Sequence, residues 1–377
     1  MPYQPRARTV VWKLYSATMP SPIAHVVGAR PNFMKAAPVV RACSDLGLNQ
    51  QLIHTGQHYD AALSTVFFDQ LDLPEPDVYL EVGSGSHGRQ TAAAMVALEE
   101  QFELLRPAAC VVYGDINSTV AAALVASKMR IPIAHVEAGL RSFDRSMPEE
   151  VNRVLTDAVS DLLLITSPEA YWNLGREGVE SEKVKFVGNT MIDTLKRGLD
   201  YLDAHPVDPP VDVDSRFALV TLHRPANVDD PRRLKEILHA LSGLAAEIQC
   251  VFPVHPRGRA AIEASGGDEI SGLQLIDPQG YLEFLTLQKA SALVITDSGG
   301  IQEEAAVLGV PCLTVRPNTE RPITISMGTN QLVEPADLID AARSALTMEH
   351  SPSVPPLWDG SAGTRAGAAL AAWLTTM

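Results

Sequence analysis

The sequence predicts an α/β protein of two domains, each built on a parallel β-sheet that helices cover on both faces. Short apolar runs rich in Val and Ile alternate with Ala- and Leu-rich amphipathic segments through most of the 377 residues. The order strand, Asp, helix, Pro-initiated strand occurs twice, at 111–136 and at 293–315. A Pro- and Asp-rich stretch at 205–215 separates the two halves. We therefore expect two Rossmann-like domains facing one cleft, with ligands at the carboxyl ends of the strands.

The first half begins with an expected strand and a Gly28-Ala29-Arg30-Pro31 turn. Apolar β-branched runs predict the strands, and the amphipathic segments between them predict the helices. We expect strands at 23–27, 78–82, 110–113 and 133–136, and helices at 33–46, 90–105 and 119–128. After the linker the same alternation predicts strands at 217–222, 250–254, 293–296 and 310–315, with helices at 303–308 and 364–374. The docking partner of the last helix stays open.

The length fits two domains of similar size, at about 100–200 residues per domain. We expect the following parts: a loose extension at 1–18, a first domain at 19–204, a linker at 205–215, a second domain at 216–355 and a helical tail at 356–377. The extension contains three basic residues but no apolar run long enough for a signal peptide, so no export is expected. No apolar run reaches the roughly 18 residues of a membrane-spanning helix.

Charge and cysteine usage limit the partners and the compartment. The chain has 45 acidic and 30 basic residues, a net charge of −15 and no Lys/Arg cluster, which disfavours nucleic acid as a main partner. An anionic small ligand remains possible, because a few Arg and helix N-termini act locally. No Cys-x-x-Cys pair occurs, and three of the four cysteines lie in β-branched runs, so we expect buried, reduced thiols and a cytoplasmic protein: Cys43, Cys110, Cys250 and Cys312.

One glycine-rich motif, at 83–88, matches Gly-x-Gly-x-x-Gly after an expected strand and before an expected helix. A dinucleotide site would also need an acidic residue about 20 positions later, at the end of the next strand. The glutamates in that region fall inside the expected helix, so a flexible loop is the favoured interpretation.

A second motif, Asp297 to Glu304, predicts an anion site. Ser298 can cap the following helix, and Gly299 and Gly300 let the backbone approach a ligand. The Glu304 carboxylate is placed to accept both hydroxyls of a ribose. A plain helix N-cap would explain the same residues without a ligand.

Basic residues follow three expected strands: Arg30, His223-Arg224-Pro225 and His255-Pro256-Arg257. Such groups suit a diphosphate, although each is equally compatible with a structural loop.

Acidic residues are the strongest candidates for chemistry. Asp115 and Glu137 end expected neighbouring strands, and Glu149 and Glu150 follow Pro148 at a helix start, where the dipole favours the charged form. Carboxylates and a histidine around one cleft allow proton transfer on two faces of a sugar. No spacing resembles a closed metal site, a nucleophile elbow or a P-loop, so we expect neither a metal nor a cofactor.

Taken together, these residues resemble the non-hydrolysing UDP-N-acetylglucosamine 2-epimerases. The similarity runs from Gly28 to about Val333, with the motifs in the family's order: 28–35, 55–60, 114–115, 135–141, 148–150, 188–190, 223–225, 277–279, 297–304 and 319–322. The resemblance implies a GT-B fold and reversible conversion of UDP-GlcNAc to UDP-ManNAc, which supplies ManNAc for surface polysaccharides. It also implies a homodimer.

The resemblance carries roles onto matching positions. The implied catalytic residues are Asp115, Glu137, Glu149 and His223. The implied substrate-binding residues are Arg30, Lys35, Gln279, Phe284, Ser298, Gly299, Gly300, Glu304 and Arg321.

The chain departs from the family pattern in two places. Ala226 stands where many members have Glu, and Tyr59 and Asp60 differ in a loop that contributes to an activating second substrate site in some members.

Three competing functions stay open beside the epimerase. The first is a hydrolysing 2-epimerase that releases free ManNAc, although Pro31-Asn32 favours the non-hydrolysing branch. The second is a GT-B glycosyltransferase that uses a UDP-sugar donor. The third is a UDP-sugar sensor without turnover, and three acids in one cleft argue against it.

Overall fold

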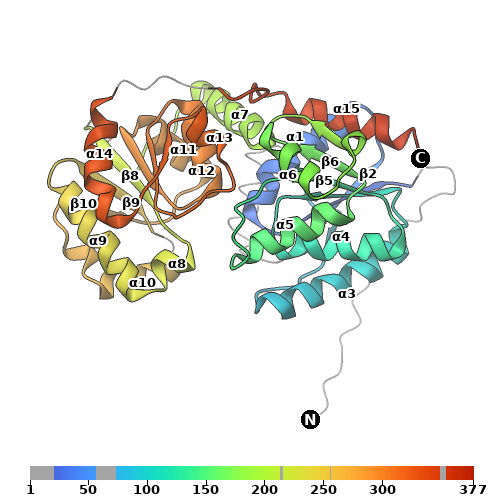
Figure 1. Ribbon diagram of the computed structural model, residues 1–377, viewed down its shortest axis with the longest axis horizontal. Helices are drawn as coiled ribbons and strands as arrows, with labels where there is room; N and C mark the ends of the chain where they lie inside the picture. Colours follow the sequence, from blue (N-terminus) through green and yellow to red (C-terminus); the bar gives the residue numbers. More distant parts are fainter. Residues whose placement is uncertain (1–20, 57–73, 213–214, 255, 349–353) are drawn as a thin grey trace, which may run out of the picture.

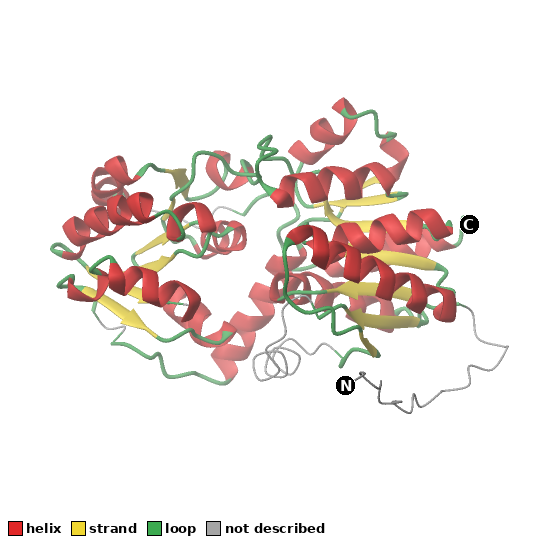
Figure 2. Cartoon of the chain, turned by 90° about the horizontal axis from the view of Figure 1, so that it is seen from below, coloured by secondary structure: helices red, strands yellow, loops and turns green. Residues whose placement is uncertain are grey.

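The computed structural model describes residues 21–56, 74–212, 215–254, 256–348 and 354–377. It contains two parallel β-sheets, each with helices on both faces, lying side by side along the longest axis of the molecule (Figures 1 and 2). The predicted fold class is confirmed. The predicted extension at 1–18, the loop with Tyr59 and Asp60, and His255 lie outside the described residues.

The first sheet has seven strands in the order β3-β2-β1-β4-β5-β6-β7. Its strands are β1 (Ile23–Val27), β2 (Gln50–His54), β3 (Val78–Tyr79), β4 (Ala109–Tyr113), β5 (Ile133–Ala138), β6 (Leu162–Ile165) and β7 (Val184–Phe186). The helices of this half are α1 (Arg30–Asp45), α3 (His87–Leu105), α4 (Asn117–Met129), α5 (Pro148–Val159), α6 (Glu169–Arg176) and α7 (Thr190–Ala204), with a short 3₁₀ helix at Ser181–Lys183. Three apolar clusters form on its faces in the described residues: one under α1 and α7, one under α3 and α4, and a smaller one between α6 and the strands β5, β6 and β7.

The second sheet has six strands in the order β10-β9-β8-β11-β12-β13. Its strands are β8 (Phe217–Thr221), β9 (Gln249–Pro253), β10 (Leu273–Ile276), β11 (Leu293–Thr296), β12 (Cys312–Thr314) and β13 (Asn330–Leu332). Its helices are α8 (Pro225–Val228), α9 (Pro231–Ala245), α10 (Pro256–Ala264), α11 (Tyr281–Ala290), α12 (Gly299–Leu308), α13 (Ile323–Ser326) and α14 (Leu338–Thr347), with 3₁₀ turns at Gly267–Glu269 and Pro335–Asp337. Helices α9 and α14 cover one face, and α11 and α12 the other.

The last helix, α15 (Ala362–Leu374), returns to the first sheet and packs on α1 and α7 (Figure 1). Ala366 and Leu370 belong to the apolar core beneath α1. Just before the helix, the indole of Trp358 is buried and donates to the carbonyl of Thr166 at 2.9 Å. The helix whose partner the sequence left open therefore docks on the first half of the chain.

Helix α7 connects the two halves. It packs on α1 and α15 and also contacts α11 and α12 of the second half. One apolar core combines Ile192 and Leu195 of α7 with Leu282 and Leu285 of α11. The predicted linker, 205–215, follows α7 in the chain and precedes β8.

The predicted elements differ from the observed ones mainly at their ends. Helix α12 begins at Gly299 rather than at 303, because glycines are tolerated in a first turn whose N–H groups have no helical partner. The strand expected at 78–82 ends at Tyr79, since Glu81 has a φ of +52° and leaves the extended conformation. No helix in the described part of the chain is long and apolar enough to cross a bilayer.

Candidate active site between the two sheets

The candidate site lies where the strand order of each sheet reverses. In the first sheet this point is between β1 and β4, and in the second it is between β8 and β11. Loops after these strands diverge in opposite directions and leave a crevice at the carboxyl edge. Arg30 follows β1 and Asp115 follows β4, while His223 follows β8 and Ser298 follows β11. The topology thus places predicted site residues of both halves just after the carboxyl ends of the strands at which the strand order reverses.

Glu137 lies within β5, the strand that pairs with β4. The register between β5 and β6 shifts from Val136 to Ala138, and Glu137 has a φ of +73°, so the strand bulges there. The Glu137 side chain is buried, and its Oε1 lies 2.7 Å from Nζ of Lys35 and 3.3 Å from Nη2 of Arg321. These contacts bring together three predicted site residues, two from the first half and one from the second.

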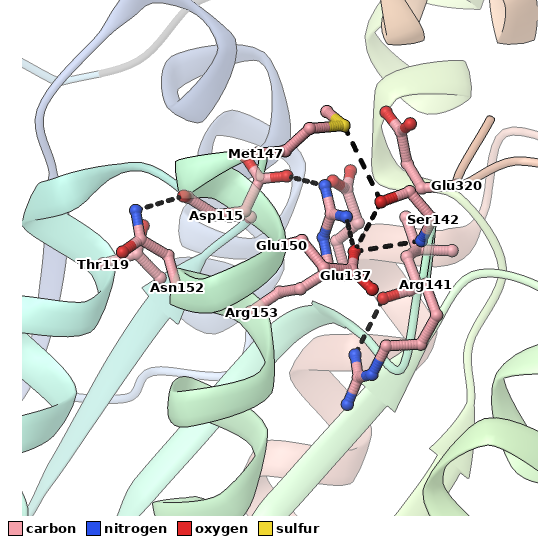
Figure 3. A network of polar contacts seen from close by, with 12 residues as sticks. Asp115, Thr119, Glu137, Arg141, Ser142, Met147, Glu150, Asn152, Arg153 and Glu320 are labelled. Carbon is pink, nitrogen blue, oxygen red and sulfur yellow. Dashed lines mark hydrogen bonds and ion pairs between the residues drawn. The ribbon is translucent and has the colours of Figure 1, made fainter. Parts of the chain in front are cut away.

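Asp115 pairs with Arg153 of α5, as Figure 3 shows. Arg153 also pairs with Glu150, and Asn152 donates to the backbone carbonyl of Asp115 at 2.9 Å. Burial works to raise the pKa of Asp115, but the charges of Arg153 and Lys35 outweigh it and lower this pKa. Asp115 is therefore a carboxylate at neutral pH.

Gly114 lies where the side chain of Lys35 passes toward the carboxylates, and a larger residue would block that approach. Its φ is +61°, and a Cβ there would lie 2.6 Å from Nζ of Lys35. Only glycine satisfies both the backbone conformation and this close approach.

The two glutamates at the start of α5 differ in environment. Glu150 is buried and accepts hydrogen bonds from the backbone N–H groups of Ser142 and Phe143, each at 2.9 Å. It fixes the loop that leads into α5 (Figure 3). Glu149 is half-buried, and its charge acts on Arg224 of the second half. Of the pair, Glu149 is the one whose charge acts on the second half.

In the second half, Asp297 organises the loop after β8. Its carboxylate accepts from the backbone N–H groups of His223 and Arg224 and from Nδ2 of Asn227. Burial opposes ionisation, but the bonds and charge of His223 lower the pKa of Asp297. The imidazole of His223 lies 3.1 Å from Asp297 and is 56% exposed, so it can reach a ligand in the crevice.

The amino end of α12 presents the backbone N–H groups of a helix N-terminus after Ser298, whose own N–H donates to Oγ1 of Thr296 at 2.9 Å. Ser298 occupies the N-cap position, but its hydroxyl makes no capping bond, so the predicted capping role of the side chain is wrong. A Cβ on Gly299 would lie 2.4 Å from Nη1 of Arg321, which explains the need for glycine there. Gly300 likewise abuts the side chain of Met191.

Glu304 is buried farther along the same helix. Its Oε1 accepts from the hydroxyl of Tyr281 at 3.3 Å. Burial raises the pKa of Glu304 to about 8, with the Tyr281 bond opposing and the charge of Glu303 adding to the shift.

Arg321, before α13, lies at the centre of the charged groups. It pairs with Glu303 at 3.0 Å and with Glu320, in addition to Glu137. Glu320 also pairs with Arg316 at 2.7 Å, and these charges hold the pKa of Glu320 well below its usual range despite its burial. Polar contacts at the rim also join the halves, since Asn318 donates to Asp144 at 3.4 Å.

Two predicted binding residues lie apart from this charged cluster. Gln279 donates to the carbonyl of Asp277 at 2.7 Å, and Phe284 packs against the core under α11 and α12. Arg30 begins α1 at the carboxyl edge of β1. No group of three His, Cys, Asp or Glu in the described ranges is arranged to hold a metal ion.

Glu150 was a candidate acid at the start of α5 without an assigned site role, and four further charged residues of this cluster were not singled out from the sequence: Arg153, Glu303, Arg316 and Glu320. A signal was present for α5, where Glu150, Arg153 and Asp157 recur with helical spacing on the buried face, while Val151 and Leu155 are exposed. Polar residues on the face that should enter the core indicate a buried polar site.

A family model described as UDP-N-acetylglucosamine 2-epimerase matches residues 41–371. The UDP-N-acetylglucosamine 2-epimerase of Methanocaldococcus jannaschii is 43% identical over 318 residues, covering 82% of this chain and 87% of that protein. The UDP-2,3-diacetamido-2,3-dideoxy-D-glucuronate 2-epimerase of Pseudomonas aeruginosa is 43% identical over 329 residues, 85% and 91% of the two chains. A crystal structure of the M. jannaschii enzyme with UDP-GlcNAc and UDP superposes with a TM-score of 0.85 at 39% identity, over 93% of this chain and 99% of that one.

Proposed function

The chain belongs to the UDP-N-acetylglucosamine 2-epimerase family, an isomerase family, and we propose that it inverts C2 of UDP-N-acetylglucosamine to give UDP-N-acetylmannosamine. One observation from the site supports this most strongly. Asp115 follows β4 and Glu137 lies in the neighbouring β5, where Glu137 pairs with Lys35 and Arg321, and the charges of both cations also act on Asp115. Acids beside cations suit a reaction that moves protons while a diphosphate departs.

The chemistry requires both kinds of group. The C2–H bond of the sugar is not acidic, because no carbonyl adjoins it. Cleavage of the C1–O bond to UDP builds positive charge at C1, after which a base removes the C2 proton and leaves a 2-acetamidoglucal. Re-addition of UDP, with protonation of C2 from the other face, inverts that centre. The enzyme therefore needs carboxylates toward both faces of C2 and stabilisation of the departing diphosphate.

Asp115, Glu137 and Glu149 supply the carboxylates in this proposal. Asp115 is ionised at neutral pH, Glu137 lies against two cations, and the charge of Glu149 acts on Arg224 of the second half. His223 and the N–H groups at the start of α12 stabilise the diphosphate, as helix N-termini do for anions. Glu304 receives the ribose hydroxyls.

The substrate class is a UDP-2-acetamido sugar. Two of the relatives at 43% identity are named for different substrates, one UDP-N-acetylglucosamine and the other a UDP-diacetamido glucuronate. Both names place the reaction at C2 and keep the 2-acetamido group. We propose UDP-N-acetylglucosamine first, because the solved relative with a TM-score of 0.85 contains that sugar nucleotide.

The test is incubation of the purified protein with UDP-GlcNAc in D₂O, followed by proton NMR. The proposed mechanism yields UDP-ManNAc with deuterium at C2, and the recovered UDP-GlcNAc also exchanges. Stoichiometric UDP with free ManNAc would make the protein a hydrolysing 2-epimerase. Release of UDP only with a sugar acceptor would make it a glycosyltransferase. The diacetamido glucuronate nucleotide, run in parallel, decides between the two substrates.

We also propose a homodimer in the cytoplasm. Helix α5 buries a polar face at the site and exposes the apolar side chains of Val151 and Leu155, at 41% and 44%. An exposed apolar helix face is typical of a protein interface. All four cysteines are free and buried, as expected in a reducing compartment.

A further inference from the structure

Glu303 has no role in the reaction proposed above, yet its carboxylate is one of the most deeply buried groups at the site. It lies on α12 with 1% of its surface exposed. Its Oε1 is 3.0 Å from Nε of Arg321, without the alignment of a hydrogen bond. Within the described residues, neither Glu303 oxygen has a hydrogen-bond partner.

Three carboxylates share the single guanidinium of Arg321. Glu320 pairs with Nη1, Glu137 lies 3.3 Å from Nη2, and Glu303 lies 3.0 Å from Nε. Because Nε and Nη2 form one edge of the planar guanidinium, Glu137 and Glu303 approach the same edge. Two buried carboxylates on one edge repel each other when both are charged.

Of the three carboxylates, Glu303 has the fewest cations to balance its negative charge. Glu137 has a second ion pair, with Lys35 at 2.7 Å, and Glu320 has one with Arg316 at 2.7 Å. In the part of the chain that the structure describes, the ion pairs of Glu303 involve Arg321 alone.

Further charges around Glu303 add to this imbalance. Glu304, its neighbour on α12, is also acidic and bonds to Tyr281. Burial raises the pKa of Glu303, and the charge of Glu137 adds to the rise, while Arg321 and Lys35 oppose it. Of the three carboxylates around Arg321, Glu303 is therefore the one that binds an added proton most readily.

We propose that Glu303 is a positioning residue that takes up a proton beside Arg321, so that one negative charge fewer lies on the guanidinium edge that it shares with Glu137 and this edge is left to pair with Glu137. This inference rests on the proposed function, because it assumes that UDP binds beside Arg321. The diphosphate of UDP brings further negative charge to the cluster. Its binding therefore favours the neutral form of Glu303 and draws a proton from the buffer onto the Glu303 carboxylate.

The experiment is calorimetric titration of the full-length protein with UDP at pH 7.5, in buffers of different ionisation enthalpy. The slope of binding enthalpy against buffer enthalpy gives the number of protons taken up. We compare the wild-type chain, Glu303→Gln and the control Glu334→Gln, a glutamate of the same domain that pairs with Arg233 at the surface. For each UDP bound, the wild type and the control should take up at least about 0.3 proton more than the Glu303→Gln variant does.

Kinetics give a second measurement. In the wild type, kcat/KM should fall as the pH rises through the ionisation of Glu303, because two charged carboxylates at Arg321 oppose binding of the diphosphate, and this basic limb should be missing in Glu303→Gln. Glu303→Asp, which retains a titrating carboxyl, should restore the limb.

The outcomes separate the two proposals. Equal proton uptake in the wild type and Glu303→Gln, with UDP still bound, overturns the role of Glu303 and leaves the epimerase intact. Absence of UDP binding by the wild type overturns both. If Glu303→Gln does not fold, the wild type decides alone, since no proton uptake between about pH 6.5 and 8.5 contradicts the proposal.

Discussion

The backbone of Glu137 adopts the left-handed conformation, with a φ of +73°, which is rare for a residue with a side chain. Such a conformation costs about 1–3 kcal/mol and persists where the surroundings hold it. Here the ion pair with Lys35 and the contact with Arg321 hold the side chain after the bulge has turned it toward the crevice. The bulge thus both strains the backbone at Glu137 and turns its carboxylate toward the crevice.

Replacing each proposed acid by its amide tests the acid/base set. Asp115→Asn, Glu137→Gln and Glu149→Gln keep the shape of the side chain but cannot accept the C2 proton. Each should lower kcat by roughly 10²–10⁴-fold with little change in UDP affinity. Steady-state kinetics and calorimetry measure the two quantities, with Glu334→Gln as the control. Wild-type rates in all three variants would remove these residues from the mechanism.

The pH dependence of stability should reveal Glu304. Burial raises its pKa to about 8 in the folded protein, above the usual value of 4.5 that applies after unfolding. Between these values the folded state binds more protons, so its free energy of unfolding falls as the pH rises. The Tm of the unliganded wild type should therefore fall more steeply between pH 5 and about 8 than the Tm of Glu304→Gln. Parallel curves would show that Glu304 ionises normally.

Much of the site could be predicted from the sequence, and the reason is the strand-end position of its residues. Asp115 and His223 follow apolar runs directly, so their place at the carboxyl edge follows from strand direction alone. Arg153 could not be assigned this way, because its partner Asp115 lies far away in the sequence and meets it only in three dimensions. The bulge at Glu137 also leaves no local signal, since its neighbours read as an ordinary strand.

At the scale of the element, α5 has its polar and apolar faces reversed relative to an ordinary surface helix. Its buried residues include Asn152, Arg153 and Asp157, whereas Val151 and Leu155 are exposed. The polar side is buried because it forms the ion pair with Asp115 and the hydrogen bonds of the site.

The exposed side of α5 supports a prediction about assembly. Leu155→Glu places a charge on the apolar face, and burying that charge in an interface is costly. We expect the wild type to elute as a dimer in size-exclusion chromatography with light scattering, and Leu155→Glu to shift toward the monomer. Lys185→Glu, a change of charge at an exposed position of β7, is the control. A variant that remains a dimer would place the interface elsewhere.

At the scale of the molecule, Arg321 joins the two halves across the crevice. Arg321→Met removes its pairs with Glu137, Glu303 and Glu320 and leaves three buried carboxylates to repel one another. The halves should separate, and the radius of gyration from small-angle scattering should increase relative to the wild type, with or without UDP. Asn318→Ala, which loses only the rim contact with Asp144, should scatter like the wild type. An unchanged profile for Arg321→Met would mean that α7 alone fixes the arrangement.

The return of α15 to the first sheet has a consequence for how the chain is made. Gly363 and Gly367 lie against Pro38 and Ala42 of α1, so the first and last helices share one apolar core. When the first seven strands have left the ribosome, α15, which packs on α1 and completes the apolar core of the first sheet, has therefore not yet been synthesised. The second half emerges and can fold while α1 still exposes apolar surface, which makes the nascent first half a client for chaperones until synthesis reaches α15.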